Sequence, residues 1–259
     1  MIREPAVAGL FYPANPRVLH QSITDFLDHA TSTGKVPKAI IVPHAGYQYS
    51  GEVAANAYHF LKQAADKIRR VILIGPSHHV GFSGVAIPSA DHFATPLGNV
   101  PIDKNTIALI SDLPFVQIRD DAHYQEHSLE VQLPFLQALL SDFSLVPIVV
   151  GDASAEEISH ALERLWNGPE TLIVVSSDLS HYHNYITAKQ MDRETSEAIE
   201  QLRPDLIGYE SACGRVPVNG LLTVALKLGL SATTLDLRNS GDTAGSKDRV
   251  VGYGAYEFH

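Results

Sequence analysis

The sequence has a single cysteine, Cys213, among 259 residues, so the chain cannot form an internal disulfide bond. A lone thiol fits a reducing compartment, where disulfides are rare. Basic residues are also scarce, because 19 lysines and arginines stand against 29 acidic residues and give a formal net charge of −10. Lysine and arginine nowhere gather into the basic stripe that a phosphate backbone requires. We therefore expect no nucleic-acid partner.

Long apolar runs are absent as well, and no segment approaches the roughly 20 residues that a membrane helix needs. The start of the chain, MIREPAVAGLFYP, lacks the apolar core and cleavage site of a secretory signal peptide. We therefore expect a cytoplasmic protein with no membrane partner. Apolar residues still make up 45% of the chain, which is enough for a sizeable globular core.

Short apolar, β-branched runs alternate with segments of helical spacing, and this pattern predicts one α/β domain. The first two strands flank a helix, so we expect them to be adjacent, parallel and joined by a right-handed crossover. A Pro/Gly/Asp-rich stretch over 89–105 predicts a long loop. The expected strands span 38–43, 71–76, 85–88, 115–118, 145–150, 171–177, 233–237 and 250–258. The expected helices span 16–33, 52–66, 126–140, 155–166, 188–202 and 218–228.

Three of the predicted strands run into histidine or aspartate. The run KAIIVP leads to His44, VILIGP leads to His78 and His79, and TLIVVSS leads to Asp178 and His181. Ligands bind just beyond the carboxyl ends of the strands in open α/β sheets. Imidazole serves both as a transition-metal ligand and as an acid or base near neutral pH. The sequence therefore predicts one shared polar site and, as the leading interpretation, a metal-dependent enzyme.

Each of these side chains also has a simpler alternative role. His44 could be bonded only to backbone, and Asp178 could be only a helix cap. Because adjacent residues point in different directions, one of His78 and His79 is expected to bind metal and the other to face the substrate or support the first. A carboxylate can fix the tautomer of a nearby imidazole, so Asp178 is expected to serve His181.

Two further positions could carry chemistry. His127 and Glu130 are three apart on an expected helix and so share a face, where they could bind metal, steer a substrate or form a surface ion pair. Cys213 lies shortly before a helix expected to begin near Pro217. A thiol close to a helix N-terminus has a lowered pKa and is a better metal ligand, whereas a free cysteine can also be a small buried hydrophobe.

Eight ordered segments resemble the Memo family, the B component of the AmmeMemoRadiSam gene set. They are AVAGLFYP, VPHAGYQYSG, ILIGPSHHV, EHSLEVQLPFL, VPIVVGD, VVSSDLSHY, ACGRVPV and VVGYGAYEF, and they cover the chain nearly end to end. Family members are related in fold to the class III extradiol ring-cleaving dioxygenases. The resemblance therefore implies one domain, residues 1–259, with a central mixed, largely parallel sheet flanked by helices.

The same resemblance implies His44, His78 and Cys213 as ligands of one metal ion. His181 matches the acid/base histidine of the dioxygenases, and Asp178 lies beside it in the same motif. The dioxygenases hold iron(II) with two histidines and a glutamate, so Cys213 would replace a carboxylate. A soft thiolate favours copper(I), zinc or iron with altered redox behaviour, which argues against ordinary catechol cleavage.

The sequence thus predicts a cytoplasmic metalloprotein with a mononuclear iron or copper site and redox chemistry on a small molecule. His181, oriented by Asp178, moves protons, and the substrate side is formed by His79, His127 and Glu130. Two alternatives stay open. The chain could be a non-enzymatic metal-binding partner in an assembly with a radical-SAM enzyme and the other gene-set component. It could also be a zinc hydrolase, since three protein ligands plus water describe a catalytic zinc site.

Overall fold

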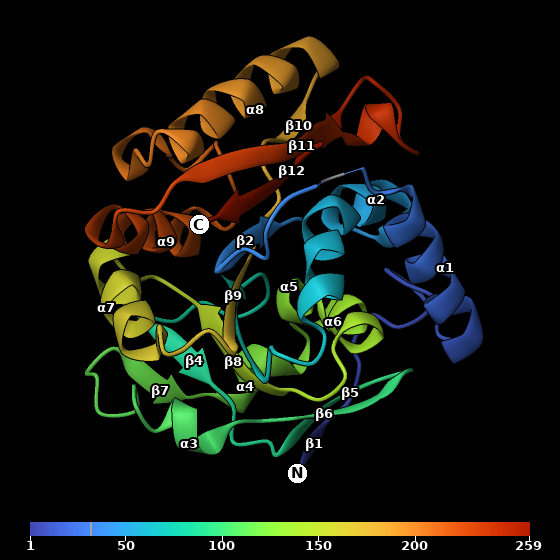
Figure 1. Ribbon diagram of the computed structural model, residues 1–259. Coiled ribbons are helices and arrows are strands. Elements are labelled where there is room, and N and C mark those ends of the chain that lie inside the picture. Colours follow the sequence, from blue (N-terminus) through green and yellow to red (C-terminus); the bar gives the residue numbers. More distant parts are fainter. Residues whose placement is uncertain (32) are drawn as a thin grey trace.

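The computed structural model describes residues 1–31 and 33–259, and a nine-stranded sheet forms its centre (Figure 1). The four central strands are parallel, apolar and almost fully buried, as expected for strands covered on both faces. In spatial order they are β2 (Ala39–Val42), β9 (Thr171–Ser176), β3 (Arg70–Pro76) and β8 (Ser144–Val150). Their carboxyl ends therefore meet at one edge of the sheet.

Antiparallel pairing flanks this parallel centre on both sides. On one side β12 (Val250–Phe258) pairs with β2 and also carries β11 (Ala232–Asn239) and the short β10 (His181–His183). On the other side β4 (Val85–Ile87) runs antiparallel to β8 and parallel to β7 (Val116–Ile118). The predicted α/β class with a mixed central sheet flanked by helices is confirmed.

The expected adjacency of the first two long strands is wrong. Strand β9 lies between β2 and β3 and pairs with both, so that Ile173 is opposite Ala39 on one side and Ile72 on the other. The crossover between β2 and β3 passes through α2 (Tyr47–Tyr58) and η1 (His59–Ala64). A β-α-β sequence predicts parallel strands, but it leaves room for a third strand that comes from elsewhere in the chain.

Helices cover both faces of the sheet (Figure 1). The strand side chains alternate between two cores, so Ile40 and Val42 face one layer while Ala39 and Ile41 face the other. The first layer contains α1 (Pro16–His29), α2, α4 (Asp120–Tyr124), α5 (His127–Glu130) and α6 (Leu133–Leu139). The second contains α3 (Lys104–Ile107), α7 (Ala155–Leu165), α8 (Tyr185–Glu200) and α9 (Arg215–Leu228).

Several predicted boundaries shift in the structure. Helix α2 begins at Tyr47, five residues before the start of the helix expected over 52–66. The helix expected over 126–140 is two short helices, and Pro134 lies in the first turn of α6, where its missing N–H leaves no bond unmade. Helix α1 ends at His29, and Ser32, in the stretch expected to continue it, lies outside the described residues. Two 3₁₀ turns complete the helical elements, η2 (Pro204–Leu206) and η3 (Ser240–Asp242).

The long loop expected over 89–105 is largely a β-hairpin. Strands β5 (His92–Thr95) and β6 (Gly98–Pro101) are antiparallel, and β1 (Ile2–Arg3) adds to β5 as a third strand. The proline and glycine residues of this stretch are typical of loops, so its two short strands were not predicted from the sequence. None of the described helices is long and apolar enough to cross a membrane.

Candidate metal centre

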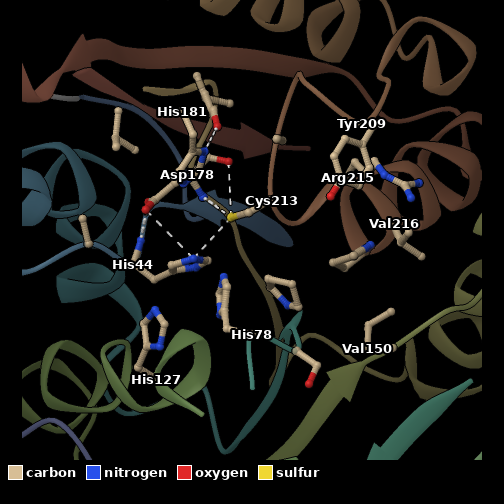
Figure 2. A pocket seen from close by; sticks show the side chains of 18 of the residues that line it. His44, His78, His127, Val150, Asp178, His181, Tyr209, Cys213, Arg215 and Val216 are labelled. Carbon is tan, nitrogen blue, oxygen red and sulfur yellow. Dashed lines mark hydrogen bonds and ion pairs between the residues drawn. The ribbon is translucent and has the colours of Figure 1, made fainter. Parts of the chain in front are cut away.

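The predicted convergence of three strand ends occurs in the structure. His44, His78 and Asp178 each follow by two residues the end of a parallel strand, respectively β2, β3 and β9. With Cys213 they line a cavity of about 1150 Å³ at this edge of the sheet, and Figure 2 shows these side chains grouped together. The sheet thus delivers its polar groups to one cavity, as expected for an open α/β fold.

The ring of His44 is buried and held in one tautomer. Its Nδ1 lies 2.9 Å from the Ser176 hydroxyl oxygen. That hydroxyl donates its only proton to the carbonyl of Ser128 at 2.6 Å and accepts from the Gln132 amide at 2.8 Å. Nδ1 must therefore donate, which leaves the lone pair on Nε2. Burial lowers the pKa of His44 to about 3, and the neighbouring His78 adds to this effect, so the ring is neutral at pH 7.

His78 is fixed in the same tautomer by a carboxylate. Its Nδ1 lies 2.8 Å from Glu126 Oε1, and its backbone N–H donates to Glu126 Oε2 at 2.6 Å. Burial alone would raise the pKa of Glu126, but hydrogen bonds and charge from His78 and the N–H of Ser128 lower it to about 2. An ionised carboxylate only accepts, so Nδ1 of His78 carries the proton and Nε2 is free to bind a metal.

Cys213 reaches this edge because the chain passes very close to the end of β9. A Cβ on Gly214 would lie 2.6 Å from the Ser177 side chain, so only glycine fits here. The Gly214 N–H donates to Ser177 Oγ at 3.0 Å, and the Asp178 N–H points at Cys213 Sγ at 3.3 Å. Sγ also lies 3.3 Å from His44 Nε2, and since that nitrogen has the lone pair, the thiol is the donor.

The expected lowering of the Cys213 pKa is wrong. Burial and the nearby Asp178 carboxylate raise the pKa of the thiol to about 12. Helix α9 does begin just beyond it, at Arg215, but desolvation outweighs any benefit from the helix terminus. Without a metal the thiol is therefore protonated at pH 7, and its proton occupies the contact with His44.

These three residues form a compact donor set. One ligand atom from each of His44, His78 and Cys213 lies within 4.8 Å of the other two. Two imidazoles that donate from Nδ1 and present Nε2 to the site, together with one thiol, fit a borderline or soft transition metal. A second group, formed by His78, Glu126 and His127, meets the same limit but shares His78 with the first.

Of the two histidines expected on the substrate side, His127 lines the cavity and His79 is not in the described lining. His127 stacks on His78 at 4.5 Å between ring centroids, and has its pKa lowered to about 4 by burial and by His44. His79, the residue after His78, is exposed, and its ring centroid lies 5.9 Å from that of His127.

The structure does not bring Glu130 to the cavity. Its carboxylate is fully buried and pairs with the guanidinium of Arg3. It also accepts from the Tyr12 hydroxyl at 2.5 Å and from the backbone N–H groups of Ala6 and Val7 at 2.7 and 3.0 Å. Glu130 thus bonds the N-terminal segment of the chain to α5. Neither Arg3 nor Tyr12 was singled out by the sequence pattern.

Asp178 and His181 stand on the opposite side of the site from His127 (Figure 2). Asp178 is buried and accepts from the backbone N–H of His44 at 2.8 Å, and burial raises the pKa of its carboxyl. The ring of His181 donates from Nδ1 to the Leu179 carbonyl at 2.8 Å. This bond, rather than one to Asp178, orients the ring. Tyr182, the next residue, has a φ of 63° and interrupts the register of β10 with β12.

A buried carboxylate lies behind this loop and gives a pH-dependent prediction. Asp192 accepts from the Ser180 N–H at 3.0 Å, and burial raises its pKa to about 6. Its contribution to stability is therefore full below the unfolded pKa of about 3.9 and is lost as pH rises through 6. Relative to Asp192→Asn, we expect the wild type to lose about 2 kcal/mol of unfolding free energy between pH 4.5 and 7.5. Urea unfolding at both pH values measures this. If the difference in unfolding free energy between wild type and Asp192→Asn is the same at pH 4.5 and 7.5, the pKa of Asp192 is not raised.

Comparison with known proteins agrees with this architecture. The family model described as Memo-like protein matches residues 3–257. A MEMO1 family protein of Saccharolobus solfataricus is 36% identical, with 100% of this chain and 99% of the relative covered. A MEMO1 family protein of Methanobrevibacter smithii is 34% identical with both chains fully covered, and one of Aeropyrum pernix is 37% identical with 98% of each covered.

A solved structure is similar in fold. It is an uncharacterized protein of Escherichia coli K12, with a TM-score of 0.50, 14% identity, and coverage of 83% of this chain and 98% of that one. At this identity the likeness concerns the fold alone. The full-length family match and the relatives above 30% identity establish more, and by them the chain belongs to the Memo-like family.

Proposed function

We propose that this chain binds one transition-metal ion through His44, His78 and Cys213 and uses it for oxidative or redox chemistry on a small molecule. The observation that carries the proposal is the donor set itself, in which one ligand atom from each of two imidazoles and a thiol lies within 4.8 Å of the others at the wall of an open cavity. A bound ion would supply a redox-active, Lewis-acidic centre at that wall. Both imidazoles are locked in the ligating tautomer before any ion arrives.

Iron and copper suit this mixture of imidazole and thiolate, and we favour them for that reason. Zinc also accepts such ligands, and a zinc hydrolase is the alternative. Elemental analysis after anaerobic purification separates the two. We expect close to one iron or copper per chain. Zinc alone would favour hydrolysis, and a metal-free protein that also fails to take up added metal would overturn the proposal.

The chain's own residues prepare the cavity for proton transfer. His181 donates from Nδ1 to the Leu179 carbonyl, which leaves Nε2 as the ring nitrogen for proton exchange with a ligand in the cavity. His127 is neutral, since burial holds its pKa near 4, so it offers a hydrogen bond without a charge. Phe11 packs against His127, with 4.8 Å between the ring centroids, and adds an apolar side chain to the cavity lining.

His181→Ala tests the proton-transfer role. We expect metal affinity to stay within about threefold of wild type, because the residue is outside the donor set. Turnover should fall by about 10²- to 10⁴-fold, the usual contribution of a general acid or base. Oxygen uptake with catechols and related aromatic diols, in air and with iron(II) restored, is the first assay. His20→Ala, on the exposed face of α1, is the control. Loss of metal together with His181 would make it a ligand instead.

A further inference from the structure

The cavity is much larger than a metal ion and its water ligands require. The donor set lies on one side of it, and Tyr209, Arg215 and Val216 lie on another side (Figure 2). Arg215 is the first residue of α9 and follows Cys213 by two positions. A ligand of ordinary small-molecule length can therefore touch both the metal side and the guanidinium.

Arg215 has a charge that the described part of the chain leaves without a counterion. Its guanidinium lies over the Tyr209 ring, 5.5 Å from the centroid, and no ion pair or side-chain hydrogen bond to it occurs among the described residues. Other half-buried arginines do have such partners, as Arg70 has Asp103 at 2.9 Å and Arg238 has Asp236. Stacking covers one face of a guanidinium and leaves its edge N–H donors free.

Three carboxylates also line the cavity, and none of them forms an ion pair with this cation. Asp178 Oδ2 lies 4.0 Å from His44 Nε2 instead. Glu210 is nearest to a different group, with Oε2 3.9 Å from His183 Nε2. Asp152 forms no ion pair within the described residues. If Arg215 were present only to balance these acids, the side chains would meet. Its donors instead remain available to a ligand.

Apolar side chains form part of the rest of the cavity wall. Phe11, Val150, Val216 and Pro217 all line the cavity. Resting on the proposed function, we propose that the cavity takes a small organic anion, a carboxylate or phosphate ester with a flat apolar body. Arg215 binds the anionic group through paired N–H donors, and the apolar body extends towards the metal side.

Matched aromatic probes test this directly. Benzoate, phenyl phosphate and the neutral isostere benzamide are titrated by ligand-observed NMR into metal-loaded protein and into protein stripped by a chelator. We expect at least one anion to bind about tenfold or more tightly than benzamide, since a charged hydrogen-bond pair is lost in the amide. The stronger of benzoate and phenyl phosphate identifies the anionic group. The preference should fall to about one in Arg215→Gln.

The control is Arg69→Gln, which removes an equal charge beside the amino end of β3, opposite to the cavity. It should keep the wild-type preference. Arg215→Gln should also keep wild-type metal stoichiometry, and the preference should persist in stripped protein, so failure of the metal proposal would be seen separately. Equal binding of anions and benzamide, a preference kept in Arg215→Gln, or no binding of any probe would overturn the inference.

Discussion

Cys213→Ser is expected to lower the affinity for one bound transition-metal ion by more than about a hundredfold. Loss of an outer partner of a metal ligand typically costs about 10- to 100-fold, and loss of the ligand should exceed that. Serine keeps the size of the side chain but has no soft thiolate to offer. Competition titration with copper(I), iron(II) and zinc measures the change in affinity.

Two further variants give this prediction a graded scale. Glu126→Gln replaces the carboxylate that accepts from His78 Nδ1, and it should cost about 10- to 100-fold. His160→Ala, on the exposed side of α7, should leave the affinity unchanged. Thermal unfolding without metal checks that each variant folds. Wild-type affinity in Cys213→Ser would remove the thiol from the donor set.

Glu130→Gln is expected to lower the free energy of unfolding by about 3–5 kcal/mol. The substitution leaves the buried guanidinium of Arg3 without its counterion, and breaking a buried ion pair on one side has this cost. The acceptors for Tyr12 and for two backbone N–H groups are weakened as well. Urea unfolding of the metal-free protein measures the loss.

A surface ion pair is the natural comparison. Glu163→Gln breaks the exposed pair with Lys227 and should cost less than about 1 kcal/mol. Metal stoichiometry of folded Glu130→Gln should match the wild type. If its stability is unchanged while ligand binding in the cavity is lost, Glu130 acts on the substrate side after all.

The sequence predicted what is determined locally. Apolar, β-branched runs ending in Pro or Gly marked the strands, and the polar residues just beyond them marked the edge at which the site forms. The order of the strands in the sheet could not be predicted, because β9 comes from a distant part of the chain and lies between β2 and β3. The hairpin over 92–101 was missed for a related reason, since its strands are stabilised by pairing with β1.

For the site, family resemblance supplied the donor set, and the structure supplied its environment. Ser176 and Glu126 fix the tautomers of His44 and His78, but each lies far along the chain from its partner. Spacing on a helix placed His127 and Glu130 on one face, although α5 is so short that one ring reaches the cavity and the carboxylate stays in the core. In the sequence, Glu126 appeared only as the first residue of the segment EHSLE, which also contains His127 and Glu130.

The Cys213 thiol shows the same limit in its electrostatics. The sequence showed the coming helix, which would lower the thiol pKa, but not the burial and the Asp178 charge that raise it. The proton between Sγ and His44 Nε2 must therefore leave when a metal binds, and the thiolate must take its place.

X-ray absorption spectroscopy of the protein loaded with one equivalent of zinc observes this replacement most directly. The donor set predicts one sulfur at about 2.3 Å and two imidazole nitrogens at about 2.0–2.1 Å, with the sulfur lost in Cys213→Ser. A wild-type spectrum with only nitrogen and oxygen neighbours would contradict the proposed metal centre.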